Sequence, residues 1–536
     1  MLQRAHRQQG NNMSKPLPDD LLLSIDCGTQ SVRAILFDTS GQVVAKSQVK
    51  FDDYVVPQPG WLEHDADGFW HAAAQACQGL WVDHAHLKGA LRGVSVTTQR
   101  GTIMPVDQQG HALHPAIIWL DQRNANHVPK MGAHWRAAFK ALGVSDTIQY
   151  FQREADANWL AEYRPDIWKQ THKFLLLSGF LNHRLTGRFV DSIGSQVGYI
   201  PFDFKKQRWA ASWDWKWQAL AMLPEHLPEL YPVGSVLGQI TRQAAEATGL
   251  PVGLPVLAAA ADKACEVLGS GCIGPEIGGL SYGTTATINI NSSKYLEALP
   301  LVPPYPAAVP DQFACEVQIF RGFWMVRWFK EQFGHQEMLT AEQTGIVPEA
   351  LFDEMVATVP PGSMGLMLQP YWSPGIRHPG RDAKGAIIGF GDIHTRAHLY
   401  RAILEGLAYA LRDGRERIEK KSRQPMKELR VSGGGSQSDA AMQLTADIFN
   451  LPACRPHTYE TSGLGAAIDS AVGLGLYSDF DSAVRAMTRV ERVFEPIQAH
   501  AGLYDELYHR IYKNMYERLA PLYKEIQSIT GYPKLD

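Results

Sequence analysis

The chain opens with three short runs of apolar, branched residues separated by small polar turns. The runs are residues 21–26, 32–38 and 43–49. Runs of this length predict β-strands, and turns this short predict an antiparallel meander. Asp67 can cap the helix that follows, whose apolar positions are three or four residues apart, and another strand is predicted at 93–98. This order of elements predicts a mixed sheet with helices packed on it.

The second half of the chain begins with a similar pattern. Strands are predicted at 279–282 and 286–290, on either side of Gly283-Thr284, as the first two strands flank Gly28-Thr29. Two similar domains that each open with a Gly-Thr hairpin are therefore expected, and two independent turns are the alternative. The later pattern predicts a proline-rich loop at 299–310, a strand at 428–431, and helices at 397–417, 440–449, 462–474 and 503–526.

Length and charge narrow the class of protein. A chain of 536 residues exceeds what one hydrophobic core usually serves, so at least two domains are expected. Lys and Arg number 51 against 55 Asp and Glu, and the net charge of −4 argues against nucleic acid as a partner. No run reaches the roughly 18 consecutive apolar residues of a membrane span, so we expect a cytoplasmic protein without a membrane partner. A homodimer is a candidate assembly, because dimers are the commonest homo-oligomers.

The cysteines and the N-terminal residues fit the same picture. The six cysteines are scattered without a C-x-x-C pair, which predicts free thiols in a reducing compartment and no zinc site. Residues 1–20 are polar and lack the apolar stretch of a signal peptide, so a disordered leader is expected there.

The turn after the first strand carries the first candidate chemistry. Gly28 lets backbone N–H groups approach an anion, Thr29 adds a hydroxyl donor, and Asp26 adds a negative charge. A carboxylate beside phosphate-binding donors requires a cation that shares the site, and Mg²⁺ is the natural choice. An ordinary hairpin turn is the alternative.

Two further loops have glycines placed for phosphate or nucleotide. Gly283 and Thr284 repeat the first turn, and residues 433–436 lie between a predicted strand and a predicted helix. Glycine there removes the Cβ that would keep the backbone away from a nucleotide. A purely structural turn is the alternative.

Asp262 follows the buried apolar run 255–261. Ligand crevices of α/β domains lie at the carboxyl ends of such strands. A carboxylate there could accept the proton of an alcohol that attacks phosphorus. A helix N-cap, which Asp also suits, is the alternative.

Other motifs are weaker. Residues 269–274 satisfy G-x-G-x-x-G, which would suggest a dehydrogenase, but they follow a predicted helix, and the nearest acidic residue in range, Glu297, comes too late. His84 and His86 have no third metal ligand placed by sequence. No P-loop, H-E-x-x-H or G-x-S-x-G motif is present.

The ordered set of motifs resembles the FGGY carbohydrate kinases. The resemblance extends from about Leu22 to beyond Ala467, nearly the whole chain. It is carried by residues 26–31, 60–63, 119–123, 262, 282–284, 385–389 and 398–405.

The resemblance implies two ribonuclease H-like (actin-like ATPase) α/β domains flanking an active-site cleft. Residues 21–275 would bind the sugar or polyol and carry the base, and residues 276–536 would bind ATP. The implied reaction transfers the γ-phosphoryl group of Mg-ATP to a substrate hydroxyl. The implied cofactors are ATP and Mg²⁺.

The resemblance also implies roles for single residues. Asp262 would be the general base, and Asp26 would orient the magnesium. The implied nucleotide-binding residues are Asp26, Gly28, Thr29, Gln30, Gly283, Thr284, Gly434, Gly435 and Asp439. The implied substrate-binding residues are Gln99, Arg100, Trp119, Asp121 and Asp262.

Departures from the family pattern leave the substrate open between xylulose-kinase-like and glycerol-kinase-like branches. Gly101 stands where glycerol kinases carry a glutamate, and the Met-His pattern of xylulose kinases is absent. Ser438 and Asp439 replace the asparagine usual near the adenine. An actin-like ATPase of the chaperone or filament type, which phosphorylates no small molecule, is the alternative function.

Overall fold

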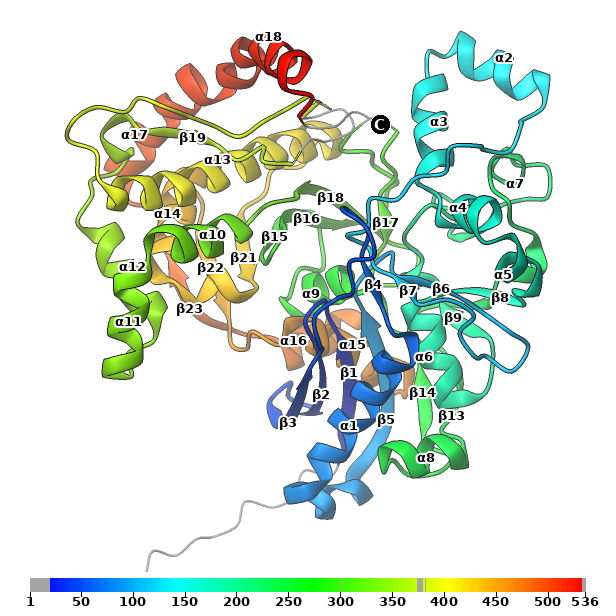
Figure 1. Ribbon diagram of the computed structural model, residues 1–536. Coiled ribbons are helices and arrows are strands. Elements are labelled where there is room, and N and C mark those ends of the chain that lie inside the picture. The colour runs from blue at the N-terminus through cyan, green and yellow to red at the C-terminus, as the bar shows by residue number, and fades with distance from the viewer. Residues whose placement is uncertain (1–19, 300, 374–378, 381, 533–536) are drawn as a thin grey trace, which may run out of the picture.

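The computed structural model describes residues 20–299, 301–373, 379–380 and 382–532 (Figure 1). Its first large sheet has the strand order β13-β14-β5-β1-β2-β3. The strands are β1 Leu21–Cys27, β2 Ser31–Asp38, β3 Val43–Lys50, β5 Leu91–Thr98, β13 Val236–Gln239 and β14 Pro255–Leu257. The meander β1–β2–β3 is antiparallel and β5 runs parallel to β1, so the predicted mixed sheet is confirmed.

The second large sheet has the order β17-β18-β16-β15-β21-β22-β23. Its strands are β15 Ile277–Tyr282, β16 Ala286–Ser292, β17 Tyr305–Pro306, β18 Phe313–Ile319, β21 Glu428–Ser432, β22 Ala453–Pro456 and β23 Val490–Phe494. From the hairpin outward, both sheets have an antiparallel hairpin, two parallel neighbours and an antiparallel edge strand. The predicted repeat of one domain plan is therefore present.

Helices cover both sheets and lie between them (Figure 1). The first sheet packs against α1 Ala66–His84, α6 Leu177–Thr186 and α8 Arg242–Thr248. The second packs against α13 Arg396–Ser422 and α14 Asp439–Phe449, with α10 Trp324–Phe333, α11 His335–Thr344, α12 Pro348–Ala357, α17 Gln498–Leu507 and α18 Lys513–Thr530 outside them. Between the sheets lie α9 Asp262–Gly269, α15 Thr461–Gly473 and α16 Phe480–Met487.

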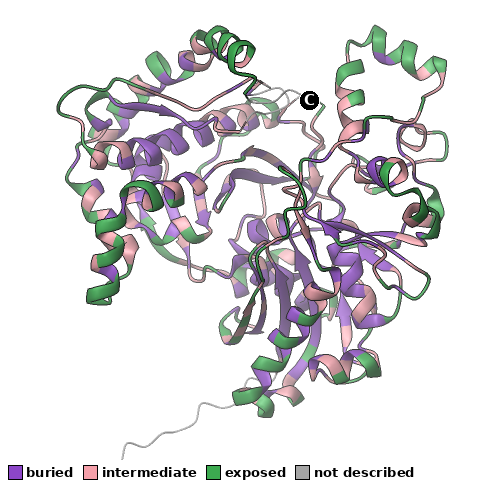
Figure 2. Ribbon diagram, in the orientation of Figure 1, coloured by how far each residue is buried: buried purple, intermediate pink, exposed green. Residues whose placement is uncertain are grey.

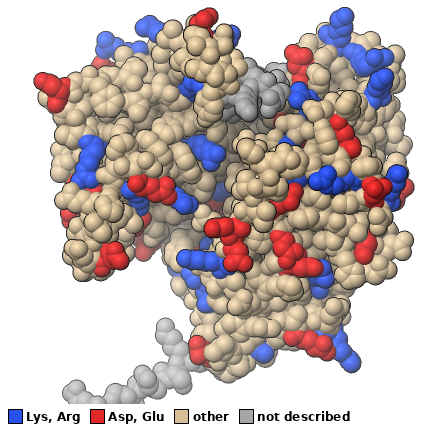
Figure 3. Space-filling view, viewed as in Figure 1, with Lys and Arg blue, Asp and Glu red and all other residues tan. Residues whose placement is uncertain are grey.

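Shorter elements extend the first half at the right of Figure 1. Its helices are α2 Ala133–Ala141, α3 Ser145–Glu154, α4 Asp156–Tyr163, α5 Pro165–Gln170 and α7 Lys216–Ala219. Other described strands are β4 Glu63–His64, β6 Ile103–Val106, β7 Ala116–Ile117, β8 Lys173–Leu176, β9 Val190–Ser192, β10 Phe202–Asp203, β11 Arg208–Trp209, β12 Glu229–Tyr231, β19 Met367–Gln369 and β20 Ala386–Ile388. Figure 3 shows a hollow between the lobe of the second sheet and the rest of the molecule, with charges of both signs on the visible face.

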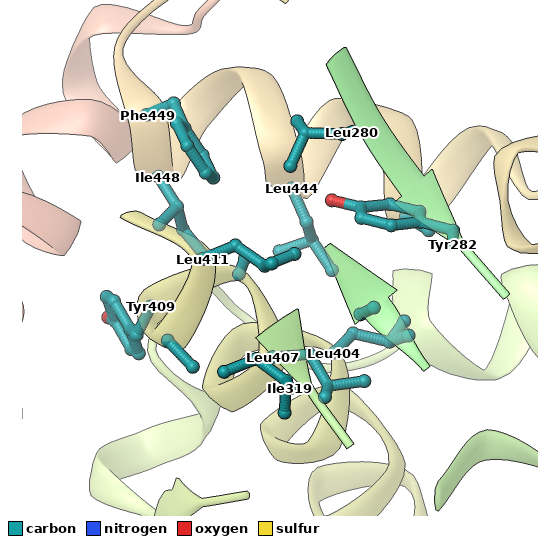
Figure 4. Close-up of a cluster of buried hydrophobic side chains, with 14 of the residues drawn as sticks. Leu280, Tyr282, Ile319, Leu404, Leu407, Tyr409, Leu411, Leu444, Ile448 and Phe449 are labelled. Atoms are coloured by element: carbon teal, nitrogen blue, oxygen red, sulfur yellow. The ribbon is translucent and has the colours of Figure 1, made fainter. Parts of the chain in front are cut away.

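Each sheet has its own hydrophobic core (Figure 2). In the second half, Leu404, Leu407 and Leu411 of α13 face Leu280 of β15 and Ile319 of β18 (Figure 4). The period of three and four residues along α13 places these side chains on one face of the helix. The cores make each sheet a firm support for the loops at its strand ends.

Helix α15 belongs to the second half of the sequence but packs on β1 and β5 of the first sheet. The Ser24 hydroxyl donates to the Gly463 carbonyl at 2.7 Å. A Cβ on Gly465 would lie 2.0 Å from the carbonyl oxygen of Cys265, so α9 and α15 approach each other backbone to backbone. This crossing connects the two halves directly beneath the predicted site.

Three local predictions differ from the structure. The N-cap of α1 is Asp65, whose carboxylate accepts from the Asp67 N–H at 3.2 Å, so the prediction of Asp67 as the cap was wrong. The predicted helix 503–526 is two helices joined by a π-helical turn at Tyr508–Tyr512. The proline-rich loop contains the short strand β17, which pairs with β18.

Two predictions about chain organisation stay open. The predicted boundary after residue 275 falls between the end of α9 and the start of β15, and it remains a prediction. Of the expected disordered leader, residues 1–19 lie outside the described residues. Among the described residues, no helix is long and apolar enough to cross a membrane.

Candidate functional site

Asp26 lies near the end of β1, directly opposite Arg33 of β2. The guanidinium Nη2 is 2.9 Å from the Asp26 Oδ2, and Nη1 donates to Glu460 at 2.7 Å. Burial, to 1% exposure, raises the pKa of Asp26 to about 6 against the opposing effect of Arg33. The nearby carboxylate of Asp262 raises this pKa further. Asp26 and Asp262 are therefore brought together, although 236 positions separate them in the numbering.

Asp262 is the first residue of α9, and the N-cap position belongs to Ala261. Its Oδ1 accepts from the Lys263 backbone N–H at 2.8 Å. Burial raises the pKa of the Asp262 carboxyl, whereas the charges of Lys263 and Arg100 lower it. Asp262 is thus not the N-cap, and its carboxylate lies in a charged environment that both halves of the chain supply.

Arg100 forms a bidentate ion pair that connects the two halves. Its guanidinium donates to the two oxygens of Glu316 in β18 at 3.0 and 3.2 Å and lies over the ring of Tyr305, 5.2 Å from the centroid. Burial opposes the charged form of Arg100, but Glu316 and Asp262 more than offset it and raise its pKa. The sequence gave no local signal for Glu316, because it lies on a strand of the other half.

Gln99 and Trp119 lie on the same side of the site. Gln99 is buried beside the Tyr54 hydroxyl, and its amide makes no hydrogen bond within 3.5 Å to any described residue. The indole N–H of Trp119 donates to the Thr29 hydroxyl at 3.2 Å, and the Tyr54 hydroxyl donates to the Thr29 carbonyl. The predicted acceptor segment therefore contacts the predicted phosphate turn.

Asp121 is fully engaged by its surroundings. Its two oxygens accept from the backbone N–H groups of Leu62 at 2.6 Å and Arg123 at 2.7 Å, and from the Arg123 guanidinium. Trp61 and Trp159 enclose that guanidinium, with ring centroids at 4.4 and 4.6 Å. Such a carboxylate stabilises the loop that carries Trp119 and has little capacity left for a ligand.

The glycine loops of the second half differ in how open they are. A Cβ on Gly434 would meet nothing within 4 Å, whereas one on Gly435 would lie 2.3 Å from the Phe323 ring. Phe323 stacks on Tyr282, with centroids 4.4 Å apart, and its N–H donates to the Gly283 carbonyl at 3.0 Å. Gly434 is open to a ligand, and Gly435 is small because an aromatic ring supports the loop.

The other predicted residues are divided between turn and surface positions. The Gly28 N–H closes its own turn on the Ser31 carbonyl at 3.1 Å, and Gln30 and Thr284 are exposed. Asp439 pairs with Arg455 at 2.7 Å and with Arg492, and these partners hold its pKa below the usual range. Asp439 thus enters the site with its charge already neutralised.

A polar cluster beneath the glycine loops was missed by sequence reasoning. The Glu266 carboxylate accepts from Ser281 and Ser432, each at 2.8 Å, and from the Lys263 ammonium at 2.7 Å. Ser281 and Ser432 are register partners in β15 and β21. The i, i+3 spacing of Lys263 and Glu266 was the one local signal available.

The donor set fits a magnesium ion carried by a nucleotide. Among the residues that the structure describes, no three His, Cys, Asp or Glu side chains are grouped to hold a metal. Asp26 is instead a single buried carboxylate with other acids nearby. Mg²⁺ is usually bound by one or two carboxylates together with substrate phosphates and water, which this arrangement allows.

Two sheets of one plan, with their Gly-Thr turns on either side of α9, define a two-domain α/β protein of the actin-like ATPase fold. The chain belongs to the FGGY family of carbohydrate kinases: the family's N-terminal domain matches residues 21–269 and its C-terminal domain matches residues 278–474. It is therefore a phosphotransferase with an alcohol group as acceptor, from a family of kinases that use ATP.

Known relatives agree with this assignment. The chain is 32% identical over 504 residues to the uncharacterized sugar kinase YgcE of Escherichia coli (strain K12), covering 92% of this chain and 93% of that protein. It is 28% identical over 505 residues to a xylulose kinase of Lactococcus lactis, covering 94% of this chain and 97% of that protein.

Solved structures show the same fold. The xylulose kinase of Rhodospirillum rubrum superposes with a TM-score of 0.77 at 26% identity, covering 94% of this chain and 100% of that chain. A glycerol kinase of Plasmodium falciparum, solved with ADP, has a TM-score of 0.73 at 18% identity, covering 92% of this chain and 98% of that chain.

Proposed function

We propose that this kinase transfers the γ-phosphoryl group of Mg-ATP to a hydroxyl of a sugar, ketose or polyol, with Asp262 as general base. The observation that carries the proposal is the position of Asp262: it begins α9, between the two Gly-Thr turns, within the fields of Asp26, Lys263 and Arg100. The glycine turns would hold the phosphates from one side, and the acceptor would lie beside Arg100.

In this proposal the acceptor oxygen attacks the terminal phosphorus while Asp262 takes its proton. The bond between the phosphorus and the β–γ bridging oxygen breaks, and ADP leaves with that oxygen. Burial raises the pKa of Asp262, which makes the carboxylate a stronger base than an exposed aspartate. Such a reaction asks for alignment and charge neutralisation more than for covalent chemistry.

Asp26 is the residue proposed to orient the magnesium ion. The ion, when bound with the nucleotide, would neutralise charge on the phosphate oxygens. Arg33 holds the Asp26 carboxylate in place through the ion pair at 2.9 Å. Thr29 and Thr284, on the two facing turns, would approach the transferring phosphoryl group, and Gly434 would border the adenosine.

The acceptor is proposed to lie between Gln99, Arg100 and Trp119. Gln99 offers a buried amide that makes no hydrogen bond to a described residue, and such a group favours a polar ligand. Arg100 is already oriented by Glu316. These features suit a molecule with several hydroxyl groups, and they support a sugar or polyol without choosing among them.

Membership of the family does not favour the chaperone or filament ATPase. That alternative would hydrolyse ATP in response to polypeptide or to self-assembly and would need no base at position 262. Cytoplasmic location and a homodimer remain predictions from the sequence.

The test is acceptor-dependent release of ADP. Unaltered protein is assayed with Mg-ATP and a panel of pentuloses, pentitols, hexitols and heptuloses, and at least one acceptor should stimulate ADP release. With that acceptor, Asp262→Asn should lower kcat by about 100- to 10,000-fold while ATP still binds. The matched control is Asp107→Asn, which removes a carboxylate from a surface turn. Full turnover in the Asp262 variant would overturn the assignment of the base.

A further inference from the structure

Lys263 directly follows the proposed base and is held by two partners. Its ammonium donates to the Glu266 Oε2 at 2.7 Å and to the Ser281 hydroxyl at 2.6 Å. The side chain is only 19% exposed. An ammonium group has three N–H donors, so these two contacts leave one donor for another acceptor.

The ammonium lies at the base of the loops proposed to hold the phosphates. Ser281 precedes Gly283 by two residues, and a Cβ on Gly283 would lie 3.8 Å from the lysine Nζ. Glu266, the other partner, also accepts from Ser432, directly before the glycines of the third loop. Lys263 therefore extends from the first half toward the ends of two strands of the second half.

The charges around Lys263 favour a cation that contacts the ligand. Asp262 and Glu266 both raise the pKa of Lys263, whereas burial and Arg100 lower it, so the group stays positive. Arg100 is committed to Glu316 in a bidentate pair, and Arg33 is shared between Asp26 and Glu460. The terminal phosphoryl group of ATP would bring new negative charge next to Asp262, where Lys263 can neutralise it.

We infer that Lys263 is a second catalytic residue: it donates its remaining N–H to an oxygen of the terminal phosphoryl group of bound ATP, while Glu266 and Ser281 fix its position. The inference rests on the proposed function, since it requires ATP in this cleft. A compact ammonium suits this task because it binds phosphate as a point charge. Lys263 would then stabilise the charge on the phosphoryl group while Asp262 removes the acceptor's proton.

The experiment compares nucleotides that differ by that phosphoryl group. Affinities for ADP and for a non-hydrolysable imido analogue of ATP are measured by calorimetry with Mg²⁺ and without acceptor. Lys263→Met should weaken the ATP analogue by about 10- to 100-fold, the range of a charge-assisted hydrogen bond, and ADP by less than about threefold. Lys263→Gln, which keeps a polar group for Glu266 and Ser281, should show the same selective loss.

Lys330→Met is the matched control. Lys330 also pairs with a glutamate, Glu349, and its side chain is 18% exposed, but it lies on α10 away from the glycine loops. This variant should leave both affinities unchanged. Equal weakening of ADP and ATP analogue in the Lys263 variants, or no weakening, would show a purely structural lysine and overturn the inference. Failure of unaltered protein to bind the ATP analogue would instead contradict the proposed function.

Discussion

At the scale of single residues, the site is a set of carboxylates that are each paired with a nearby cation. Asp26 has Arg33, Glu316 has Arg100, and Glu266 has Lys263. Asp262 has no such pair in hydrogen-bond contact within the described part of the chain and accepts only from a backbone N–H. That difference is what suits Asp262 for taking a proton, because its oxygens are not already committed.

The pKa of Asp26 leads to a prediction about stability and pH. A folded-state pKa of about 6 lies above the unfolded value near 3.8, so the fold favours the protonated form. This contribution is present below about pH 4 and is lost as the pH rises through about 6. Without nucleotide or Mg²⁺, Asp26→Asn should therefore gain thermal stability relative to the unaltered protein as the pH rises from 4 to 7.

Thermal midpoints of the two proteins, measured across that pH range, test this prediction. Asp38→Asn, a change in an exposed turn, is the control and should give a difference independent of pH. A constant difference for Asp26→Asn would contradict the prediction. For the unaltered enzyme, we also expect the Mg²⁺ concentration that gives half-maximal activity to increase as the pH falls below about 6.

At the scale of elements, the crossing of α9 and α15 positions the proposed base. α9 begins at Asp262, and its backbone lies against α15 at Gly465. α15 is in turn fixed to the first sheet by hydrogen bonds from Ser24 and Ser95. A shift of α15 would therefore move the first turn of α9 and the carboxylate that it carries.

A single methyl group tests the crossing. In Gly465→Ala the new Cβ would meet the Cys265 carbonyl at 2.0 Å, so the helices must separate, and we expect a loss of about 1–3 kcal/mol or more. Gly502→Ala in α17 is the matched control, because nothing lies within 4 Å of its Cβ, and it should be neutral or stabilising. Chemical denaturation measures both, and equal behaviour of the two variants would refute the close contact.

At the scale of the whole molecule, groups from both halves build the acceptor side. Arg100 of the first half is oriented by Glu316 and covered by Tyr305 of the second. Since the halves meet through this pair, it contributes to the relative position of the two sheets as well as to the pocket. Closure of two lobes on a substrate commonly completes such sites.

Removing the carboxylate should separate acceptor binding from nucleotide binding. In Glu316→Gln the Arg100 guanidinium loses its charged partner, so we expect the KM for the acceptor to rise about tenfold, while the affinity for ADP stays the same. Glu297→Gln, which removes a carboxylate elsewhere in the second half, is the control. Steady-state kinetics and calorimetry give the two quantities, and an unchanged acceptor KM would contradict the role of the pair.

Much of the fold was predicted from the sequence because the relevant signals are local. The apolar runs of the meander, the Gly-Thr turns at Gly28 and Gly283, and the periodicity of α13 depend on residues a few positions apart. The errors were local as well: Asp65 and Asp67 both suit a helix N-terminus, and only the backbone geometry selects one. Asp26, Asp262 and the glycine loops were found because strand ends and turns mark where ligands bind.

By itself the sequence determined the two hairpin-led halves and the acidic and glycine residues of the candidate site. Only the tertiary structure decided how these residues are used: Arg100 finds Glu316 on the other half, Lys263 reaches Ser281, and Asp439 is neutralised by two arginines. The physical reason is that hydrophobic periodicity acts between neighbours along the chain. Ion pairs and backbone contacts depend on distances that exist only once the two sheets and α15 have packed together.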